Sequence, residues 1–469
     1  MARRPAIVRP LARPAAWSLV ALAAFATPGA AHSGALRAAG RDPVSAPVWL
    51  FLLTGGAAVG ASFLLASFVT DRRLIDAVHG WSRSLSLSTR PLRVLARLVG
   101  LAGLAAVLVV GWVGPDTGVR NLAVLLVWVV WWGGVVAAAY LVGNAWPALD
   151  PFRALAGAAR SVADRFGVGT LAYPDRLGTW PSVAGLLAVV WVEVTAPLAD
   201  DPRLLASVVA AYGLLTVAGA VAVGPTWFDR VDPVSCLLAA YGRVAPVALT
   251  DEGPRLRLPG TRLSDPIVSG LDEVAFVVAV LYVTTYDGLV ATGPWAAAVG
   301  WLVGLGAPPL AVYLGTYLVG FGAALGAYLL AARAARRFAA TYRSPGALAT
   351  RFAPPLLAIA AGYHLAHNVG TVLALSPAFA TVLAAPLSPP QNPPTLVLPG
   401  WIQGVEIAAV LAGHVLAVWV AHAAAYDAFP DRIQAVRSQY GVTLAMVGFT
   451  MLSLWIVSEP YVAPPYLAS

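Results

Sequence analysis

The sequence predicts an all-α fold: a polytopic transmembrane helical bundle of about ten spans after a signal peptide. Of the 469 residues, 59% are hydrophobic and only 11% are charged, and the mean hydropathy is +0.76. A soluble domain carries about 25% charged residues, so this chain has too few charges to cover a soluble protein of its length. Apolar stretches long enough to cross a bilayer recur from end to end. Membrane lipid is therefore the expected surrounding.

Residues 1–31 are typical of a secretory signal peptide. Four arginines precede a short apolar core at 17–26, and small residues at 28–31 suit cleavage. An uncleaved first helix remains the alternative. Cleavage after Ala31 would leave 32–46 as an extracytoplasmic segment beginning at His32. A free amino group beside an imidazole would suit copper.

The transmembrane domain is expected over 47–458, followed by an extracytoplasmic tail at 459–469. Each predicted span is long enough to cross about 30 Å of hydrocarbon at about 1.5 Å per residue. The ten spans are expected at 47–70, 95–114, 121–143, 179–199, 203–224, 267–290, 307–332, 353–374, 400–426 and 440–458.

The arginines alternate with the spans. All 30 basic residues are arginine, and they gather in every second loop, at 71–94, 144–178, 225–266, 333–352 and 427–439. The loops between them hold only Arg120 and Arg203. By the positive-inside rule the basic loops are cytoplasmic. A multi-pass protein of the plasma membrane with both mature termini extracytoplasmic is the resulting prediction.

A weak internal repeat follows the third and fifth spans. Trp146 to Pro151 and Trp227 to Pro233 each end in Asp-Pro, where the aspartate can cap the next helix. The preferred interpretation is two interfacial helices on the cytoplasmic surface, and a substrate or lipid-headgroup site is the alternative.

Other classes of function are disfavoured by what the sequence lacks. Cys236 is the only cysteine, which excludes an intramolecular disulfide, an iron–sulfur site and a cysteine-based zinc site. The sequence contains no Walker loop, GxSxG or GxGxxG motif and no nucleic-acid module. The lipid bilayer is the expected partner, with a small molecule or metal ion as ligand, and neither nucleic acid nor nucleotide.

Histidines concentrate in the eighth and ninth spans. His364 and His367 are three residues apart on the eighth, and His414 and His422 follow Glu406 on the ninth. If these spans pack antiparallel, His364, His367 and His414 could converge at similar depth. Neutral imidazole binds transition metals or haem, and a histidine ladder could relay protons. Metal or haem binding, a proton or solute path, hydrolysis, and simple packing across helix interfaces all stay open.

Three carboxylates are predicted toward the outer leaflet. Glu193 lies late in the fourth span, Asp287 late in the sixth and Glu406 early in the ninth. Ionisable groups within spans are costly and mark function by default. They could form one acidic vestibule, or each could be solvated separately at the interface.

Several stretches resemble a family of multi-pass membrane proteins commonly labelled fenitrothion hydrolase. The matching pieces are Ala31-His32 with Asp42-Pro43, Trp146 to Arg153, Thr284 to Gly288, Ala366-His367, Gly413-His414, Ala421-His422 and Ala435 to Tyr440. The resemblance implies a polytopic helical fold and hydrolysis of an organophosphorus ester. The sequence departs from the family pattern at two positions. His364 is an addition, and Ala423 stands where the family has aspartate.

Three hypotheses for function follow. The first is transport or metal handling at an intramembrane histidine-rich site. The second is a membrane-bound hydrolase in which a histidine-bound metal activates water, as the resemblance implies. The third is a structural membrane protein whose histidines only pack.

Overall fold

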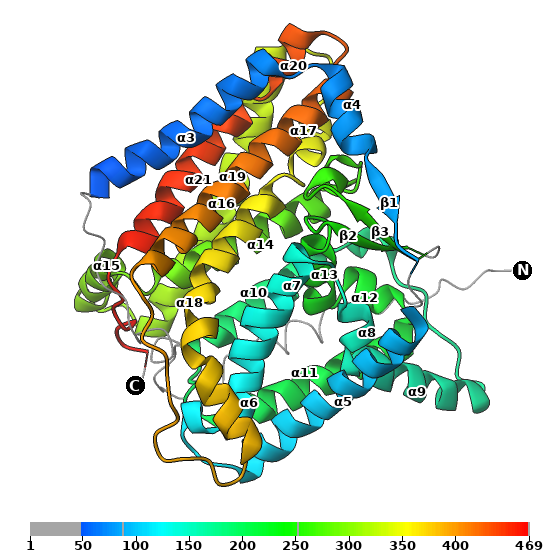
Figure 1. Cartoon of the computed structure of the whole chain (residues 1–469), viewed down its shortest axis with the longest axis vertical. Coiled ribbons are helices and arrows are strands. Elements are labelled where there is room, and N and C mark those ends of the chain that lie inside the picture. Colours follow the sequence, from blue (N-terminus) through cyan, green and yellow to red (C-terminus); the bar gives the residue numbers. More distant parts are fainter. Residues whose placement is uncertain (1–47, 87–88, 251–252, 468–469) are drawn as a thin grey trace, which may run out of the picture.

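The computed structural model describes residues 48–86, 89–250 and 253–467, which form a bundle of helices with one small sheet (Figure 1). The predicted signal peptide 1–31, the segment 32–46 and His32 lie outside the described residues. The all-α prediction is confirmed.

Eight helical segments in the described part are long and apolar enough to cross a membrane. They are α3 (Val48–Val69), α5 (Thr89–Val113), the run of α6 (Leu122–Leu125), η2 (Leu126–Val135) and α7 (Val136–Leu141), α11 (Pro202–Val223), α16 (Pro309–Ala339), the pair α17 (Pro345–Phe352) and α18 (Leu356–Ala384), α19 (Trp401–Ala428), and the pair α20 (Arg432–Ser438) and α21 (Tyr440–Ser458).

Two further apolar segments are irregular. Helices α14 (Leu271–Leu289) and α15 (Gly293–Gly304) make a ninth span only as a pair, because the chain bends by 83° between them. Helix α10 (Trp180–Thr195) has 16 residues, which reach about 24 Å and fall short of a bilayer core of about 30 Å. Every predicted span thus contains a helix, and eight helical segments of the described residues, or nine with the bent pair, are long and apolar enough to cross a membrane.

Short elements fill the loops. On the side of the basic loops they are α4 (Arg72–Gly80), β1 (Ser82–Ser84), α8 (Trp146–Leu149), α9 (Pro151–Arg165), η3 (Asp175–Leu177), α12 (Thr226–Arg230), α13 (Pro233–Tyr241), β2 (Val247–Thr250), β3 (Gly253–Arg257) and η4 (Thr261–Ser264). The short turn η1 (Gly118–Arg120) follows α5 at the other side.

The sheet has three antiparallel strands in the order β1-β3-β2. Strands β2 and β3 form a hairpin, in which Val247 pairs with Leu256. Strand β1 then adds to the free edge of β3, with Arg83 opposite Leu256. The sheet therefore joins two basic loops that are far apart in the sequence.

The five basic loops meet on one face of the molecule. Arg351 of the fourth basic loop donates to the carbonyl of Ser264 in the third at 2.9 Å and pairs with Asp427 of the fifth. Arg230 and Asp175 link the third loop with the second at 3.4 Å, and the sheet links it with the first. The basic loops, which alternate with arginine-poor loops along the sequence, therefore lie together on one side of the folded chain. We call this side the basic face.

The arginine-poor loops meet at the opposite ends of the helices. Arg203 pairs with Asp116 at 3.3 Å, and Arg120 donates to the carbonyl of Pro390 at 3.1 Å. The C-terminal tail adds to this side, since the Val462 N–H donates to Ala291 O and the Tyr313 hydroxyl to Pro465 O. We call this side the arginine-poor face.

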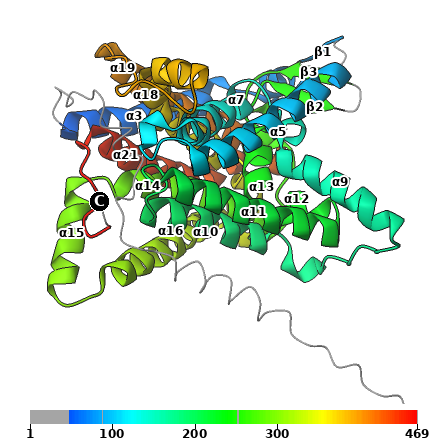
Figure 2. The same ribbon diagram turned by 90° about the horizontal axis from the view of Figure 1, so that it is seen from below.

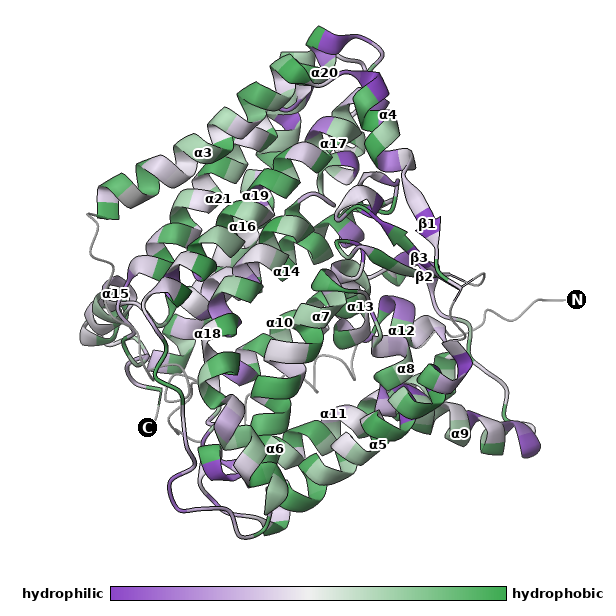
Figure 3. Cartoon of the chain, viewed as in Figure 1, coloured by the Kyte–Doolittle hydropathy of each residue, from purple (hydrophilic) through white to green (hydrophobic). Residues whose placement is uncertain are grey.

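Between the two faces the outer helices consist mostly of hydrophobic residues, as the colouring of α3 and α5 in Figure 3 shows. Leu65 of α3 and Leu98 of α5 are 64% and 59% exposed. Water would not tolerate so much apolar surface on helices of this length, whereas hydrocarbon does. The chain is an integral membrane protein surrounded by lipid.

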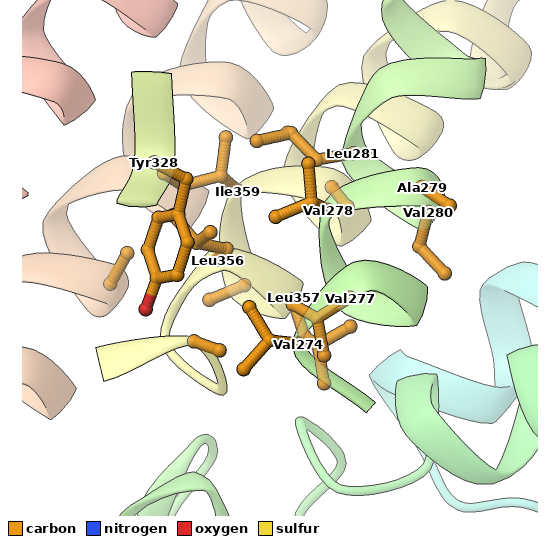
Figure 4. Close-up of a cluster of buried hydrophobic side chains, with 14 of the residues drawn as sticks. Val274, Val277, Val278, Ala279, Val280, Leu281, Tyr328, Leu356, Leu357 and Ile359 are labelled. Carbon is orange, nitrogen blue, oxygen red and sulfur yellow. The ribbon is translucent and has the colours of Figure 1, made fainter. Parts of the chain in front are cut away.

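The core lies where α14, α16 and α18 pack together (Figure 4). Val274, Val277 and Val278 of α14 lie near Leu356 and Leu357 of α18, and all five are buried. Tyr328 of α16 is buried beside them, and its hydroxyl donates to Ala349 O at 2.6 Å. Branched and aromatic side chains thus hold α14 against the helix that carries His364 and His367.

The two Asp-Pro turns cap helices as predicted, but the helices differ. Asp150 accepts from the Phe152 and Arg153 N–H groups at the start of α9, which lies at the edge of the molecule (Figure 2). Asp232 accepts from the Ser235 N–H at the start of α13. The prediction of two surface helices is wrong for α13, most of which is buried because it is apolar on every side.

Cys236 of α13 is a packed residue. Its side chain is buried, and its thiol lies 3.8 Å from the carbonyl of Phe228. Burial raises the pKa of this thiol to about 12. A neutral thiol is a poor nucleophile, so the structure gives Cys236 no reactive role.

The capping carboxyl of Asp150 predicts a pH-dependent stability. Burial raises its pKa to about 6, and the charge of Asp232 adds to the rise against the backbone hydrogen bonds. The folded pKa exceeds the unfolded value of about 3.9. Protonation of Asp150 therefore stabilises the folded state fully below about pH 3.9. This stabilisation is lost as the pH rises through about 6.

We therefore expect Asp150→Asn, which keeps the cap without the charge, to raise the Tm of the purified protein at about pH 8. The gain should shrink at about pH 5, where the wild-type carboxyl is already mostly protonated. Asp201→Asn, at the exposed cap of α11, is the control and should change the Tm by the same amount at both pH values. A pH-independent effect of Asp150→Asn would contradict this account.

Candidate functional site

Helices α18 and α19 cross at two glycines. A Cβ atom on Gly362 would lie 2.5 Å from the Ala409 carbonyl, and one on Gly413 would lie 2.6 Å from the Ala358 carbonyl. The two backbones therefore touch, as small residues allow in membrane helices. This contact fixes His364 and His367 on one helix relative to Glu406, His414 and His422 on the other.

His364 is surrounded by aromatic rings from the first half of the chain. Its Nδ1 lies 3.0 Å from the hydroxyl of Tyr140 on α7, and only 1% of the residue is exposed. The rings of Trp132 and Tyr241 pack at centroid distances of 5.0 and 6.0 Å. Trp132 belongs to η2, a π-helix of ten residues. Such helices are rare and often mark functional positions.

His367 instead faces a carboxylate on α14. Its Nε2 lies 3.3 Å from Oδ2 of Asp287, and both side chains are about one-tenth exposed, at 11% and 12%. The Tyr363 ring stacks on the imidazole at a centroid distance of 5.7 Å. Asp287 lies one half-turn before α14 ends at Leu289, beside the 83° bend. The pair therefore sits beside the bend that separates the apolar helices α14 and α15.

An aromatic cluster borders Asp287. Tyr286, the preceding residue, packs on Tyr317 of α16 at a centroid distance of 4.7 Å. Tyr282 donates to Tyr317 O, and Tyr317 donates to Leu187 O of α10. Tyr317 lies within electrostatic range of both Glu193 and Asp287. The structure thus brings two of the three predicted outer carboxylates toward one aromatic cluster.

The third predicted carboxylate, Glu406, lies at the contact of α18 and α19. The residue is 5% exposed, and a Cβ on Gly370 would lie 3.0 Å from its Oε1. It thus reaches the backbone of α18 one turn beyond His367. A single vestibule of Glu193, Asp287 and Glu406 stays a prediction.

The two histidines of α19 have separate surroundings. His414 is fully buried, and its Nδ1 lies 2.9 Å from the carbonyl of Val410, one turn earlier in the same helix. His422 is also fully buried, with its Nδ1 3.2 Å from the amide oxygen of Gln439 and its ring against Tyr426. These bonds suit neutral imidazoles that each satisfy one local partner.

The four histidines thus contact different helices. In the described ranges, no three histidine, cysteine or carboxylate side chains are grouped so that they could hold a metal ion. Metal or haem binding at His364, His367, His414 and His422 stays a prediction. The histidine–carboxylate contact described above is the pair of His367 and Asp287.

Sequence reasoning missed the partners of His364. Trp132, Tyr140 and Tyr241 come from an apolar helix and a loop helix that carry no motif. The only local hint is Gly133-Gly134 within the π-helix, where a Cβ on Gly133 would lie 2.3 Å from Val372 of α18. Small residues there let η2 approach the histidine helix.

Comparison of the chain with protein-family models, with curated proteins and with solved structures finds no match. A buried imidazole facing a carboxylate can accept and release a proton.

The glycine crossing gives a stability prediction. Gly413→Ala should lower the Tm of the purified protein by several degrees, because the added methyl meets a backbone carbonyl and overpacking costs about 1–3 kcal/mol. Gly404→Ala on the same helix is the control, since a Cβ there meets nothing within 4 Å. An unchanged Tm for Gly413→Ala would show that the two helices can separate freely.

Proposed function

We propose that the protein is a proton-coupled transport protein, in which His367 and Asp287 exchange the coupled proton. The observation that carries this proposal is their 3.3 Å contact at about one-tenth exposure within the membrane-spanning bundle. Taking a carboxylate out of water is costly even when it is paired. Stability alone gives little reason to keep such a pair, whereas proton relays use it.

The break between α14 and α15 supports a transport function. Many transporters bind their substrates where membrane helices are discontinuous. Here Asp287 lies beside an 83° bend and next to the rings of Tyr286 and Tyr317. We propose that the transported species is a small molecule that contacts these rings. Metal handling, the other form of this hypothesis, would need further ligands around the pair.

A hydrolase of organophosphorus esters is the second candidate. The resemblance to the fenitrothion hydrolase family suggests it. The pair supports it as well, because an imidazole oriented by a carboxylate is the usual general base for activating water. The two candidates use the same residues but differ in what they move: a proton across the bilayer, or a water onto phosphorus.

Proton movement in reconstituted liposomes tests the first candidate. Liposomes containing the wild-type protein and an internal pH dye should respond to an imposed membrane potential faster than empty liposomes. Asp287→Asn and His367→Gln should bring the rate down to that of empty liposomes, because each removes a proton-exchanging group. Asp116→Asn, a largely exposed carboxylate on the arginine-poor face, is the control and should keep the wild-type rate.

An aryl phosphotriester assay on the same preparations separates the candidates. Hydrolysis that is lost in Asp287→Asn and His367→Gln, without proton movement in the wild type, would replace transport by the hydrolase. A wild-type proton flux equal to that of empty liposomes, with no hydrolysis, would leave the structural hypothesis.

We also propose that the protein lies in the plasma membrane with its basic face in the cytoplasm and both mature termini outside. The five arginine-bearing loops supply the asymmetry that the positive-inside rule requires. Their meeting on one face supports the proposal, since every basic loop must then lie on the same side.

Cysteine labelling tests this orientation in a Cys236→Ser background. Ser388→Cys on the arginine-poor face should react with an impermeant maleimide in intact cells. Ser161→Cys on the basic face should react only after permeabilisation, and both positions are exposed. The reverse pattern would invert the topology.

A further inference from the structure

Three arginines lie close together on the basic face without carboxylate partners. Arg243 follows α13, Arg257 ends β3 and Arg262 lies in η4, and all three are half-buried. We call them the arginine cluster. In the described part of the chain, none of them lies within ion-pair distance of a carboxylate.

Backbone hydrogen bonds hold the cluster together. The Arg257 N–H donates to Pro246 O, and the Gly260 N–H donates to Val244 O, both at 2.8 Å. The Arg262 guanidinium reaches the Gly242 carbonyl at 3.4 Å. Gly260 has a positive φ of 75°, which lets the chain turn between Arg257 and Arg262. The three segments are therefore fixed by the fold.

The guanidinium groups are close enough to repel. Burial lowers the pKa of Arg262, and the positive charge of Arg257 lowers it further. Burial likewise lowers the pKa of Arg243, with a further decrease from Arg262. Bringing like charges together costs free energy unless an anion offsets it.

The two nearby carboxylates do not neutralise the cluster. Asp265 is exposed and attracts Arg243 and Arg262 from beyond ion-pair distance. Glu273 caps α14, where it accepts hydrogen bonds from Ser269 and from the Gly270 N–H. Among the described residues, the three arginines therefore face Asp265 as the one carboxylate without a capping role, which leaves an excess of positive charge there.

Buried polar atoms without partners lie in the same segments. Within the described residues, Arg257 Nε, Ser264 Oγ and His79 Nε2 are buried and make no hydrogen bond. His79 of α4 joins this group because it lies beside the Thr261 backbone and Asp265, and its ring stacks on Trp419 of α19. Unsatisfied buried donors are uncommon in native structures, and these three are free to bond a ligand.

The cluster lies deep on the basic side. A Cβ on Gly260 would contact Leu416, near the middle of α19, at 2.8 Å. The turn at Gly260 thus reaches α19, while the β2–β3 hairpin lies at the edge of the bundle (Figure 1). An anion here would be partly shielded from water, which strengthens its contact with guanidinium groups.

We propose that the arginine cluster binds a phosphate group that enters from the basic face. Planar guanidinium groups match the oxygens of phosphate, and the donors of Arg257 and Ser264 would complete its hydrogen bonds. The phosphate can belong to an anionic phospholipid or be free in solution. This site is separate from the pair of His367 and Asp287, so the proposal does not depend on the transport function.

Two binding measurements on the full chain test the site and distinguish the two sources. Inorganic phosphate is titrated by calorimetry into protein held in phosphatidylcholine nanodiscs. Retention of phosphatidylglycerol is measured by native mass spectrometry of detergent-purified protein. Arg257→Gln and Arg262→Gln should each weaken whichever ligand binds by about tenfold, the usual effect of one charge-assisted hydrogen bond.

Arg337→Gln is the matched control, because Arg337 is an exposed arginine at the basic end of α16. Loss of phosphate binding in the cluster variants alone identifies free phosphate, and loss of phosphatidylglycerol alone identifies a lipid headgroup. Binding of neither ligand to the wild type, or an equal loss in Arg337→Gln, would overturn the proposal. The Tm of Arg257→Gln without ligand should not fall, since this change removes a repulsive charge.

Discussion

The close backbone contact of α18 and α19 at Gly362 and Gly413 is the constraint on which the rest of the bundle depends. In lipid, helices gain little from hiding apolar side chains, so close packing must hold them together. Once these two helices touch, the remaining elements arrange around their outer sides. The π-helix η2 with α7 covers His364, and α14 covers His367. One contact thus sets which helix each histidine meets.

The interior polar groups follow two patterns. Many bond a carbonyl of their own helix, as when His414 bonds the Val410 carbonyl through Nδ1 or Asn368 donates to the His364 carbonyl. Such local bonds cost the fold little and need no function. The contact of His367 with Asp287 instead joins two helices, one of which ends nearby. A proton or ligand that changed this contact would change the packing of α14 against α18.

The sequence predicts spans better than sites. Apolar length locates the membrane spans, each of which contains a helix, and the arginine pattern separates the two faces, because both depend only on residue order. The direction in which a buried histidine points depends on its neighbours, so helical spacing alone does not predict that His364 contacts Tyr140 or that His367 contacts Asp287. The sheet was missed because strands of three to five residues carry little periodicity. The arginine cluster was missed because its members are scattered through one loop.

The ends of the described chain meet in the folded protein. Helix α3 packs against α21, where a Cβ on Gly55 would collide with Leu454. Arg72 donates to the carbonyl of Phe429, and Arg432 to that of Ser67. During synthesis α3 therefore enters the bilayer long before α21, its neighbour in the folded bundle, has been made. A chain that ended before α19 and α21 would leave α3 without either of the helices that pack against it, and such an incomplete bundle would be prone to misassembly.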